Sequence, residues 1–411
     1  MAKIRPLRFA RPPRELVREV SAYPYDIVNT EEAAKLVAGN PLSFLHVTKS
    51  QIDLPPDTDQ YSQSVYDLAR QKLCGFFEEG VLKRDAEPCF YLYCQKMAGH
   101  TQCGLVAGVS VDDFEAGLVK AHESTLQEKL EDRTRHIEIV EAQTGPIFLT
   151  YRHSEKLDGF IGEVKKRPPV YDFETPDGIL HTVWQISSAG EIEFVERQFE
   201  NVDSIYIADG HHRAASAVNV ARKHREKSGA GRWPGDFVFS VLFPDNALNI
   251  NAYNRAVKDL NGLDRAGFLG KVADIFNVTE SIQGKSPANL HQFGMYLDGK
   301  WYLLEVPASA LSGRDAVGSL DTSLLQECIL APVLGIADPR TDRRIKFIGG
   351  SRGTAELERL VDSGEFAVAF NLYPTTISQI MEVADEGKIM PPKSTWFEPK
   401  LRDGIFVHIL K

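Results

Sequence analysis

The chain has 411 residues, of which 43% are hydrophobic and 25% are charged, and its formal net charge is -10. At roughly 100–200 residues per domain, this length predicts two or three domains or one large compound one, with the composition of an ordinary soluble protein. The acidic balance argues against non-specific nucleic-acid binding, which needs a basic face. No apolar run is long enough to predict a membrane span.

The N-terminal segment and the cysteines indicate the cellular compartment that we expect for this protein. The segment from Met1 to Arg18 is basic and interrupted by prolines, so we expect no signal peptide there. Five cysteines, an odd number without a Cys-x-x-Cys motif, predict free thiols in a reducing cytoplasm. A zinc site built from Cys89, Cys94 and Cys103 is the alternative, although their spacing matches no common zinc pattern.

Periodicity and turn residues predict a mixture of helices and strands along the chain. Asn29 caps a short helix that ends by Gly39, and Gly80 closes a longer one. This longer helix covers 60–79, and further helices are expected from 112 to about 133, after Gly210, at Arg255, and over 265–276, 321–330, 353–362 and 375–386. Strands are expected at 44–47, 90–97, 104–111, 147–151, 183–186, 191–196, 204–208, 237–243, 300–306, 344–348, 366–370 and 405–410.

The alternation of these elements predicts an α/β or mixed α+β fold with undetermined sheet order. We divide the chain into an N-terminal α/β region (1–110), a core (111–245) and a C-terminal α/β region (246–411) whose last loop could complete a site. The Gly- and Pro-rich loop near 229–235 and the segment near 245–262 are the best candidates for boundaries.

The central feature is the stretch Asp209-Gly210-His211-His212-Arg213, where a buried strand gives way directly to a helix. The free amides and the positive dipole end of a helix favour an anion at such a position. Gly210 allows close approach of the backbone, and Arg213 offers a planar fork for phosphate or carboxylate. The sequence therefore predicts a phosphate-binding turn. The alternative is structural: Asp209 is an N-cap and the histidines fill the helix start.

A second cluster surrounds His122, Glu123 and Thr125, followed by Lys129, Asp132 and Arg133. Residues three or four apart share one face of a helix, so His122, Thr125 and Lys129 could form a stripe. A solvated face with ion pairs is the ordinary outcome for such a run. If Glu123 or Asp132 instead faces a pocket, it could accept a proton from a hydroxyl or hold magnesium.

A third cluster is the loop from Met390 to Gly404, which two prolines stiffen at its start. Its potential hydrogen-bond donors to phosphate oxygens are Lys393, Ser394, Thr395 and Lys400.

A fourth feature, the Gly-rich turn 349–353 behind a basic patch, could also bind an anion. It lacks the spacing of a P-loop or a dinucleotide fingerprint, so a tight turn that caps a helix is the simpler interpretation.

Four motifs in order resemble one bacterial and archaeal family, the domain-of-unknown-function family ten-fifteen. They are Asn40-Pro41-x-Ser43-Phe44-Leu45-His46-Val47, His122-Glu123-x-Thr125, Ala208-Asp209-Gly210-His211-His212-Arg213 and Pro391-Pro392-Lys393-Ser394-Thr395-x-Phe397-x-Pro399-Lys400. The segment Ser21–Val28 also fits the style of this family. The Asp-Gly-His-His-Arg turn in addition resembles that of free-serine kinases with the ParB/sulfiredoxin-like fold.

This resemblance implies a ParB/sulfiredoxin-like core with additional α/β regions, and an enzyme that phosphorylates L-serine with ATP, ADP or pyrophosphate and Mg²⁺. The catalytic residues would be Glu123 as base, Asp209 and His211, with Asp209 also holding the metal. His122 and Thr125 would bind the substrate. The phosphate would contact Gly210, His212, Arg213, Lys393, Ser394, Thr395 and Lys400.

Sulfiredoxins carry a cysteine where this chain has His211, which argues against sulfinic-acid reduction. We therefore expect a cytoplasmic small-molecule phosphotransferase whose partners are a small substrate and a nucleotide, without nucleic acid or membrane. The physics of phosphoryl transfer, which asks for phosphate clamps, a metal and a carboxylate near the nucleophile, fits these residue types. A nucleotide-binding regulatory module without turnover is the alternative function.

Overall fold

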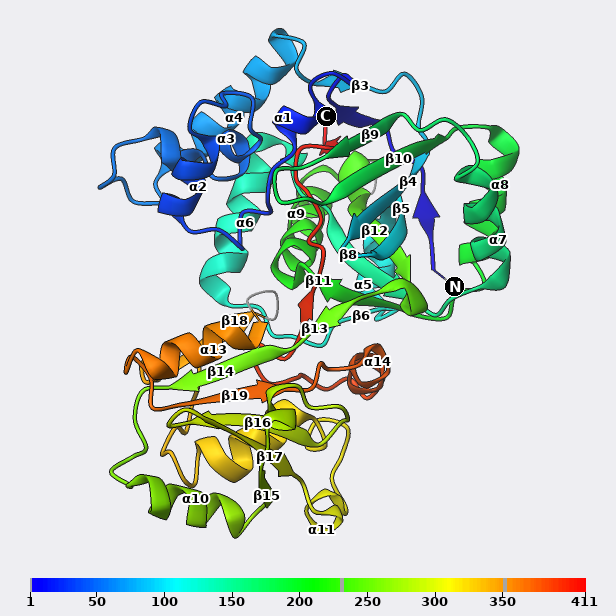
Figure 1. Ribbon diagram of the computed structural model, residues 1–411. Coiled ribbons are helices and arrows are strands. Elements are labelled where there is room, and N and C mark those ends of the chain that lie inside the picture. The colour runs from blue at the N-terminus through cyan, green and yellow to red at the C-terminus, as the bar shows by residue number, and fades with distance from the viewer. Residues whose placement is uncertain (1, 230–232, 350–352) are drawn as a thin grey trace. The chain divides into compact units, whose positions relative to one another are not determined.

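The computed structural model describes residues 2–229, 233–349 and 353–411, and its contacts group the chain into two units (Figure 1). Unit 1 consists of the residues up to Asn249 together with Pro399–Lys411, and unit 2 is Ile250–Glu398. Both units combine helices with β-sheet, which confirms the mixed α/β class. The first segment of unit 1 ends at Asn249, close to the domain boundary expected near 245. The finer division into three regions stays a prediction.

Unit 1 contains a large mixed sheet in the order β6-β11-β8-β12-β5-β4-β10-β9, with β1 beside β5. Its strands are β1 (Ile4–Arg5), β4 (Phe90–Met97), β5 (His100–Ser110), β6 (Val119–Lys120), β8 (Ile147–Tyr151), β9 (Tyr171–Glu174), β10 (Leu180–Ile186), β11 (Ile205–Asp209) and β12 (Phe237–Pro244). β12 runs parallel to β8 and antiparallel to β5. Because β8 and β12 lie inside the sheet and are buried almost throughout, their sequences are continuously apolar rather than alternating.

A smaller sheet of unit 1 joins segments that are far apart in the sequence. It has the order β3 (Lys83–Arg84), β2 (Phe9–Arg11), β21 (Val407–Ile409), β7 (Ala142–Gln143). The last strand of the chain therefore pairs with β2 near the N-terminus and with β7 in mid-chain. This pairing brings the C-terminal segment 399–411 into unit 1.

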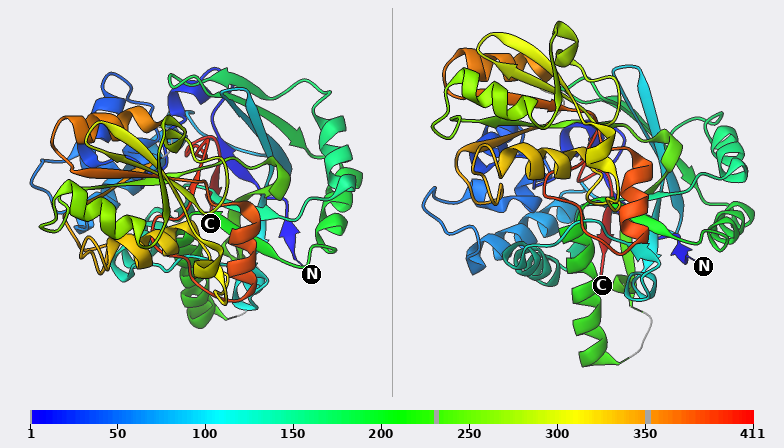
Figure 2. Two further views of the ribbon diagram at one scale, coloured as in Figure 1. Left: turned by 60° about the horizontal axis from the view of Figure 1, so that its bottom comes forward. Right: turned by 90° about the horizontal axis from the view of Figure 1, so that it is seen from below.

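The helices of unit 1 are mostly short, with α4, α6 and α9 the long ones. They are α1 (Val17–Val20), α2 (Thr30–Val37), α3 (Leu45–Thr48), η1 (Ser50–Asp53), α4 (Gln63–Glu78), α5 (Val111–Glu115), α6 (Gln127–Val140), α7 (Glu155–Val164), α8 (Ala189–Phe199), α9 (His211–Ser228), η2 (Pro234–Asp236) and η3 (Asp245–Ala247). α6 packs against α9 on one side and against α4 on the other. α9 is the long green helix in the right view of Figure 2. None of the helices described in either unit is long and apolar enough to cross a membrane.

Unit 2 is built on an antiparallel sheet in the order β15-β17-β16-β19-β14-β18, and a two-stranded ribbon, β13-β20. The strands are β13 (Ile250–Asn251), β14 (Tyr253–Val257), β15 (Asn277–Glu280), β16 (Gln292–Leu297), β17 (Lys300–Glu305), β18 (Ile345–Gly349), β19 (Val368–Leu372) and β20 (Trp396–Phe397). The helices are α10 (Arg265–Ala273), η4 (Ile282–Lys285), α11 (Ala308–Leu311), α12 (Asp321–Leu325), η5 (Gln326–Leu330), α13 (Gly353–Asp362) and α14 (Ile377–Asp385). Alternation along β14 places Val257 in a core with Leu324, and Ala256 in a second core with Leu357. Both faces of this sheet are therefore covered.

Two elements predicted as strands are helices. Residues 45–47 lie in the single helical turn of α3, whose side chains are all buried, and Phe44 is the N-cap of this turn. A four-residue apolar run does not distinguish a strand from a buried helical turn. Residues 191–196 lie in α8, where the side chain of Ser188 accepts a hydrogen bond from the amide of Glu191. This N-cap fixes the helix start, and the alternating apolar pattern that indicated a strand is also compatible with one buried helical face.

Two expected helices are also wrong. The polar run after residue 112 divides into α5, the short strand β6 and an irregular segment before α6 begins at Gln127. His122 and Thr125 therefore do not share a helical face with Lys129. Arg255, expected at a helix start, lies in the middle of β14. By contrast, the helix cap predicted at Asn29 is present, and it is a capping box, because Asn29 and Glu32 exchange both hydrogen bonds.

The expectation that all cysteines are free thiols is wrong for one pair. Cys94 and Cys103 are directly opposite each other on β4 and β5 and form a disulfide, with 4.1 Å between their Cα atoms. Cys74, Cys89 and Cys328 are free. The zinc alternative fails as well, because the disulfide consumes two of its three ligands. The glycine-rich turn at 349–353 falls largely outside the described residues.

Candidate functional site at the N-terminus of α9

Gly210 separates β11 from α9 and adopts a left-handed conformation with φ of +93°. This conformation strains residues with a Cβ, and an added Cβ would also lie 3.2 Å from Nε of Arg213. The side chain of Arg213 therefore lies over the glycine. The chain passes from buried strand to helix in one residue, so the side chains of the motif are held close to the sheet.

Asp209 is held in an ion pair at this turn. Its Oδ1 accepts a hydrogen bond from the amide of Gly210 at 2.8 Å, and its Oδ2 lies 2.8 Å from Nζ of Lys400. Burial by itself would raise the pKa of Asp209, but Lys400 and Arg213 outweigh it and hold the pKa well below its usual range. Asp209 is therefore a carboxylate at every ordinary pH, with Lys400 as its fixed counter-ion.

The two histidines of the motif bind the irregular segment between β6 and α6. Nε2 of His211 accepts the amide of His122 at 3.4 Å, and Nε2 of His212 accepts the amide of Leu126 at 3.0 Å. Because a backbone amide can only donate, the Nε2 atom of His211 carries no proton and its Nδ1 atom carries one. This Nδ1 lies 3.5 Å from Oε2 of Glu123. The histidine pair thus positions Glu123 at the start of α9.

Burial keeps His211 and His122 neutral. It lowers the pKa of His211 to about 4, and burial together with neighbouring His211 lowers that of His122 to about 3. The two rings meet edge to face with 4.5 Å between their centroids. Glu123 differs from both, because 36% of its side chain is exposed. His211 and Glu123 therefore place a buried neutral imidazole beside a carboxylate that solvent and ligands can reach.

Arg213 is almost fully buried and has partners on two sides. Its Nη1 donates to the carbonyl of Pro146 at 2.5 Å, and its Nη2 lies 3.8 Å from Oδ2 of Asp26. Nε of Arg213 and Oδ1 of Asp403 are both buried without a hydrogen-bond partner among the described residues. Arg213 is therefore a structural cation, and its Nε–H group is a donor without a partner among the described residues.

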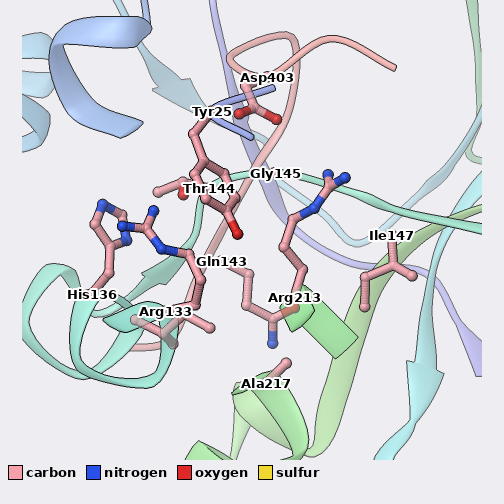
Figure 3. Close-up of a pocket in the computed structure, with 11 residues that line it drawn as sticks. Tyr25, Arg133, His136, Gln143, Thr144, Gly145, Ile147, Arg213, Ala217 and Asp403 are labelled. Atoms are coloured by element: carbon pink, nitrogen blue, oxygen red, sulfur yellow. The ribbon is translucent and has the colours of Figure 1, made fainter. Parts of the chain in front are cut away.

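Arg213 lines a small cavity together with Arg133, Tyr25 and Asp403 (Figure 3). The guanidinium of Arg133 lies over the Tyr25 ring, 4.2 Å from its centroid. The cavity has a volume of about 30 Å³, which is enough for about two water molecules. It is therefore too small for a substrate.

The carboxyl of Asp403 in the wall of this cavity has a raised pKa. Burial raises its pKa to about 7, although nearby Arg213 acts in the opposite direction. Its Oδ1 faces the backbone of Gly145, where an added Cβ would lie at only 2.4 Å. The close approach of this carboxyl explains why a glycine stands at position 145.

The predicted site residues fall into two groups. Unit 1 brings His122, Glu123, Lys400 and the turn from Asp209 to Arg213 together, while Thr125 lies half-buried in the same segment as Glu123. Lys393, Ser394 and Thr395 belong to unit 2. There Ser394 is buried, donates to the carbonyl of Pro391 at 2.6 Å, and lies 3.0 Å from Oγ1 of Thr322. Its hydroxyl therefore holds the loop together.

Magnesium receives limited support from the protein side chains. Across residues 2–229, 233–349 and 353–411, no three or more His, Cys, Asp or Glu side chains are grouped so that they could hold a metal. The oxygens of Asp209, the predicted ligand, are already engaged by Lys400 and Gly210. Magnesium often binds through one or two carboxylates plus substrate phosphates. The magnesium prediction therefore stays a prediction for an ion held by one carboxylate and the phosphates of the donor.

Sequence reasoning missed the carboxylates and the aromatic ring that surround Arg213. Asp26 and Tyr25 lie in the N-terminal segment that resembles the family, and Asp403 lies at the end of the third cluster, but none was assigned a role. The available signal was the position of these residues inside the motifs. Their partner, Arg213, is nearly two hundred residues away in the chain, so spacing could not reveal the contact.

The chain belongs to the family described as protein of unknown function (DUF1015), whose model matches residues 4–323. No curated protein matches the sequence. Solved structures similar to it include a free serine kinase in complex with AMP, at 14% identity and a TM-score of 0.38, with 74% of this chain and 91% of that chain covered.

Two further solved structures are similar at comparable levels. A conserved hypothetical protein from Pyrococcus furiosus is 16% identical, with a TM-score of 0.34 and coverage of 74% of this chain and 95% of that one. C-terminally truncated SbnI from Staphylococcus aureus is 12% identical, with a TM-score of 0.36 and coverage of 72% and 85%. Scores at this level transfer no function to this chain.

Proposed function

We propose that this protein is a small-molecule phosphotransferase that moves a phosphoryl group from ATP, ADP or pyrophosphate to a hydroxyl acceptor, with free L-serine as the first candidate. The observation that carries the proposal is the placement of Glu123. This partly exposed carboxylate lies beside neutral His211 at the N-terminus of α9. A positioned carboxylate next to an anion-favouring helix end is the pairing that phosphoryl transfer needs.

In this proposal Glu123 is the general base. It accepts the proton of the acceptor hydroxyl while the hydroxyl oxygen forms a bond to the terminal phosphorus of the donor. The bond from that phosphorus to its bridging oxygen breaks, and the leaving phosphate keeps the electron pair. His211 acts as a positioning residue, because its Nδ1–H faces Glu123 and its Nε2 is fixed by the amide of His122.

The donor phosphates would lie against the first amides of α9, where the helix dipole is positive. Lys400 and Arg213 support this role because Asp209 and Asp26 hold them rigidly close to the turn. Fixed cations that need no rearrangement stabilise developing negative charge better than mobile ones. His212 contributes indirectly, since it binds the amide of Leu126 and so orders the segment that carries Glu123.

The proposal is tested by incubating the purified full-length protein with L-serine and, separately, ATP, ADP and pyrophosphate in the presence of Mg²⁺. Formation of O-phosphoserine is followed by phosphorus NMR and by mass spectrometry. We expect product with at least one donor. Binding of a nucleotide without transfer to serine or to other small alcohols would overturn the proposal and favour the regulatory module.

A further inference from the structure

Arg255 in unit 2 is a buried guanidinium whose partners are electrically neutral. It lies in the centre of β14 with an exposed fraction of 3%. Its Nη2 donates to the carbonyl of Lys393 at 2.9 Å, and its Nη1 donates to the carbonyl of Tyr253. The guanidinium also lies over the ring of Phe347, with 4.8 Å from Cζ to the ring centroid.

Two other arginines with little exposed side-chain surface have a carboxylate beside them. Arg133 pairs with Asp132 at 2.7 Å, and Arg402 pairs with Asp177. For Arg255, no ion pair with a carboxylate is found within the described part of the chain. Burial accordingly lowers the pKa of Arg255 to about 10. Buried charges in proteins are normally paired, because removing an ion from water is costly.

This guanidinium lines a cavity of about 380 Å³ within unit 2. Small-molecule sites usually measure about 300–1,000 Å³, so the volume is that of a ligand site. The cavity beside Arg213 in unit 1 has about 30 Å³ and is far below this range. Of these two cavities, the one at Arg255 therefore combines a ligand-sized volume with a cation that has no carboxylate partner among the described residues.

The walls of this cavity are mixed in character. Apolar contributions come from Leu330, Phe347, Pro391 and Pro392. Oε1 of Gln326 is buried without a hydrogen-bond partner, and its amide nitrogen donates to the carbonyl of Ile336 at 2.8 Å. The carboxylate of Asp338 also lines the cavity, but it is paired with exposed Arg340 at 2.9 Å and so leaves Arg255 without a counter-charge.

We propose that the cavity around Arg255 is a binding site for a small organic oxyanion, a carboxylate or phosphate carried on an apolar body. The oxyanion binds the guanidinium of Arg255, and the apolar body packs against Phe347 and the two prolines. This site lies entirely in unit 2 and is independent of the phosphotransfer proposed for unit 1.

The test is isothermal titration of the full-length protein with phenyl phosphate and with benzoate, and with benzyl alcohol as the uncharged control. We expect at least one oxyanion to bind and benzyl alcohol not to bind. Comparison of the two oxyanions shows whether the site prefers phosphate or carboxylate. Arg255→Met should weaken binding by at least about tenfold, the value of one charge-assisted hydrogen bond.

Because Arg255 also holds two backbone carbonyls, a second variant tests the cavity without touching the arginine. Ala337 is exposed at the cavity wall, so Ala337→Phe fills the space and should weaken binding similarly. Arg359→Met, at an exposed arginine of α13, is the matched control and should leave binding unchanged. Phosphate bound at the turn of unit 1 would survive all three substitutions. The proposal is overturned if wild-type protein binds neither oxyanion, or if Arg255→Met and Ala337→Phe change neither affinity nor stoichiometry.

Discussion

The buried carboxyl of Asp403 predicts a defined pH dependence of stability. Asp403 lies behind the α9 turn with 1% of its surface exposed, and Oδ1 has no partner among the described residues. Substitution Asp403→Asn keeps the shape of the side chain but removes its ability to ionise. The variant therefore isolates what the ionisation of this one group costs the fold.

The magnitude follows from the shift itself. Burial raises the pKa of Asp403 from its ordinary value of 3.8 to about 7. Between these values the folded protein holds a proton that the unfolded chain has released, so the free energy of unfolding falls as the pH rises. At about 1.36 kcal/mol per pKa unit, a shift of this size gives a loss on the order of 4 kcal/mol between pH 4 and pH 7. The uncharged amide in Asp403→Asn cannot suffer this loss, so the variant gains stability relative to wild type as the pH rises.

The assay is urea unfolding of wild type and Asp403→Asn, followed by tryptophan fluorescence at intervals from pH 4 to pH 8. The informative quantity is the difference in the free energy of unfolding, because groups common to both proteins cancel. Asp274→Asn, at an exposed position after α10, serves as the control. A difference that stays flat between pH 4 and pH 7, or that moves in favour of wild type, would refute the assignment of Asp403 as a buried, reluctantly ionised acid.

Two further predictions concern the packing around the turn. Lys400→Met leaves the carboxylate of Asp209 without its cation, so we expect the free energy of unfolding to fall by about 3–5 kcal/mol and to recover largely when Asp209→Asn is added; a loss below about 1 kcal/mol in chemical denaturation would contradict the pairing. Gly145→Ala places a Cβ 2.4 Å from Oδ1 of Asp403 and should cost about 1–3 kcal/mol, whereas Gly159→Ala in α7 meets open space and should stabilise by up to about 1 kcal/mol. Equal melting-temperature shifts in the two alanine variants would count against the close approach of Asp403.

Local signals in the sequence predicted much of the fold, and the errors have physical causes. Apolar runs stopped by turn residues placed β4, β8 and β12 within a residue or so of their observed bounds. The segments at 44–47 and 191–196 failed because a short run with buried residues suits either a strand or a helical turn. The Cys94–Cys103 disulfide depends on the exact register of β4 against β5, which the thiol count could not supply.

The candidate site was partly predictable for a similar reason. The strand, glycine and helix at Asp209–Arg213 are local features, and the sequence identified them. The partners of these side chains are distant or belong to the backbone: Lys400 pairs with Asp209, and the amide of Leu126 binds His212. A backbone amide leaves no signal in the sequence. The sequence therefore assigned His211 to catalysis and His212 to phosphate, without the backbone amides of His122 and Leu126 that these rings bind in the structure.

The most direct test of the central claim compares the rate of serine phosphorylation by Glu123→Gln with that of Glu131→Gln, an exposed glutamate on α6. Loss of a general base costs about 10²–10⁴ in rate, so we expect kcat to fall by that factor in Glu123→Gln and to stay at the wild-type value in Glu131→Gln. Circular dichroism and the melting temperature should match wild type in both, because both side chains reach solvent. A Glu123→Gln enzyme that phosphorylates serine as fast as wild type would contradict the role assigned to this carboxylate.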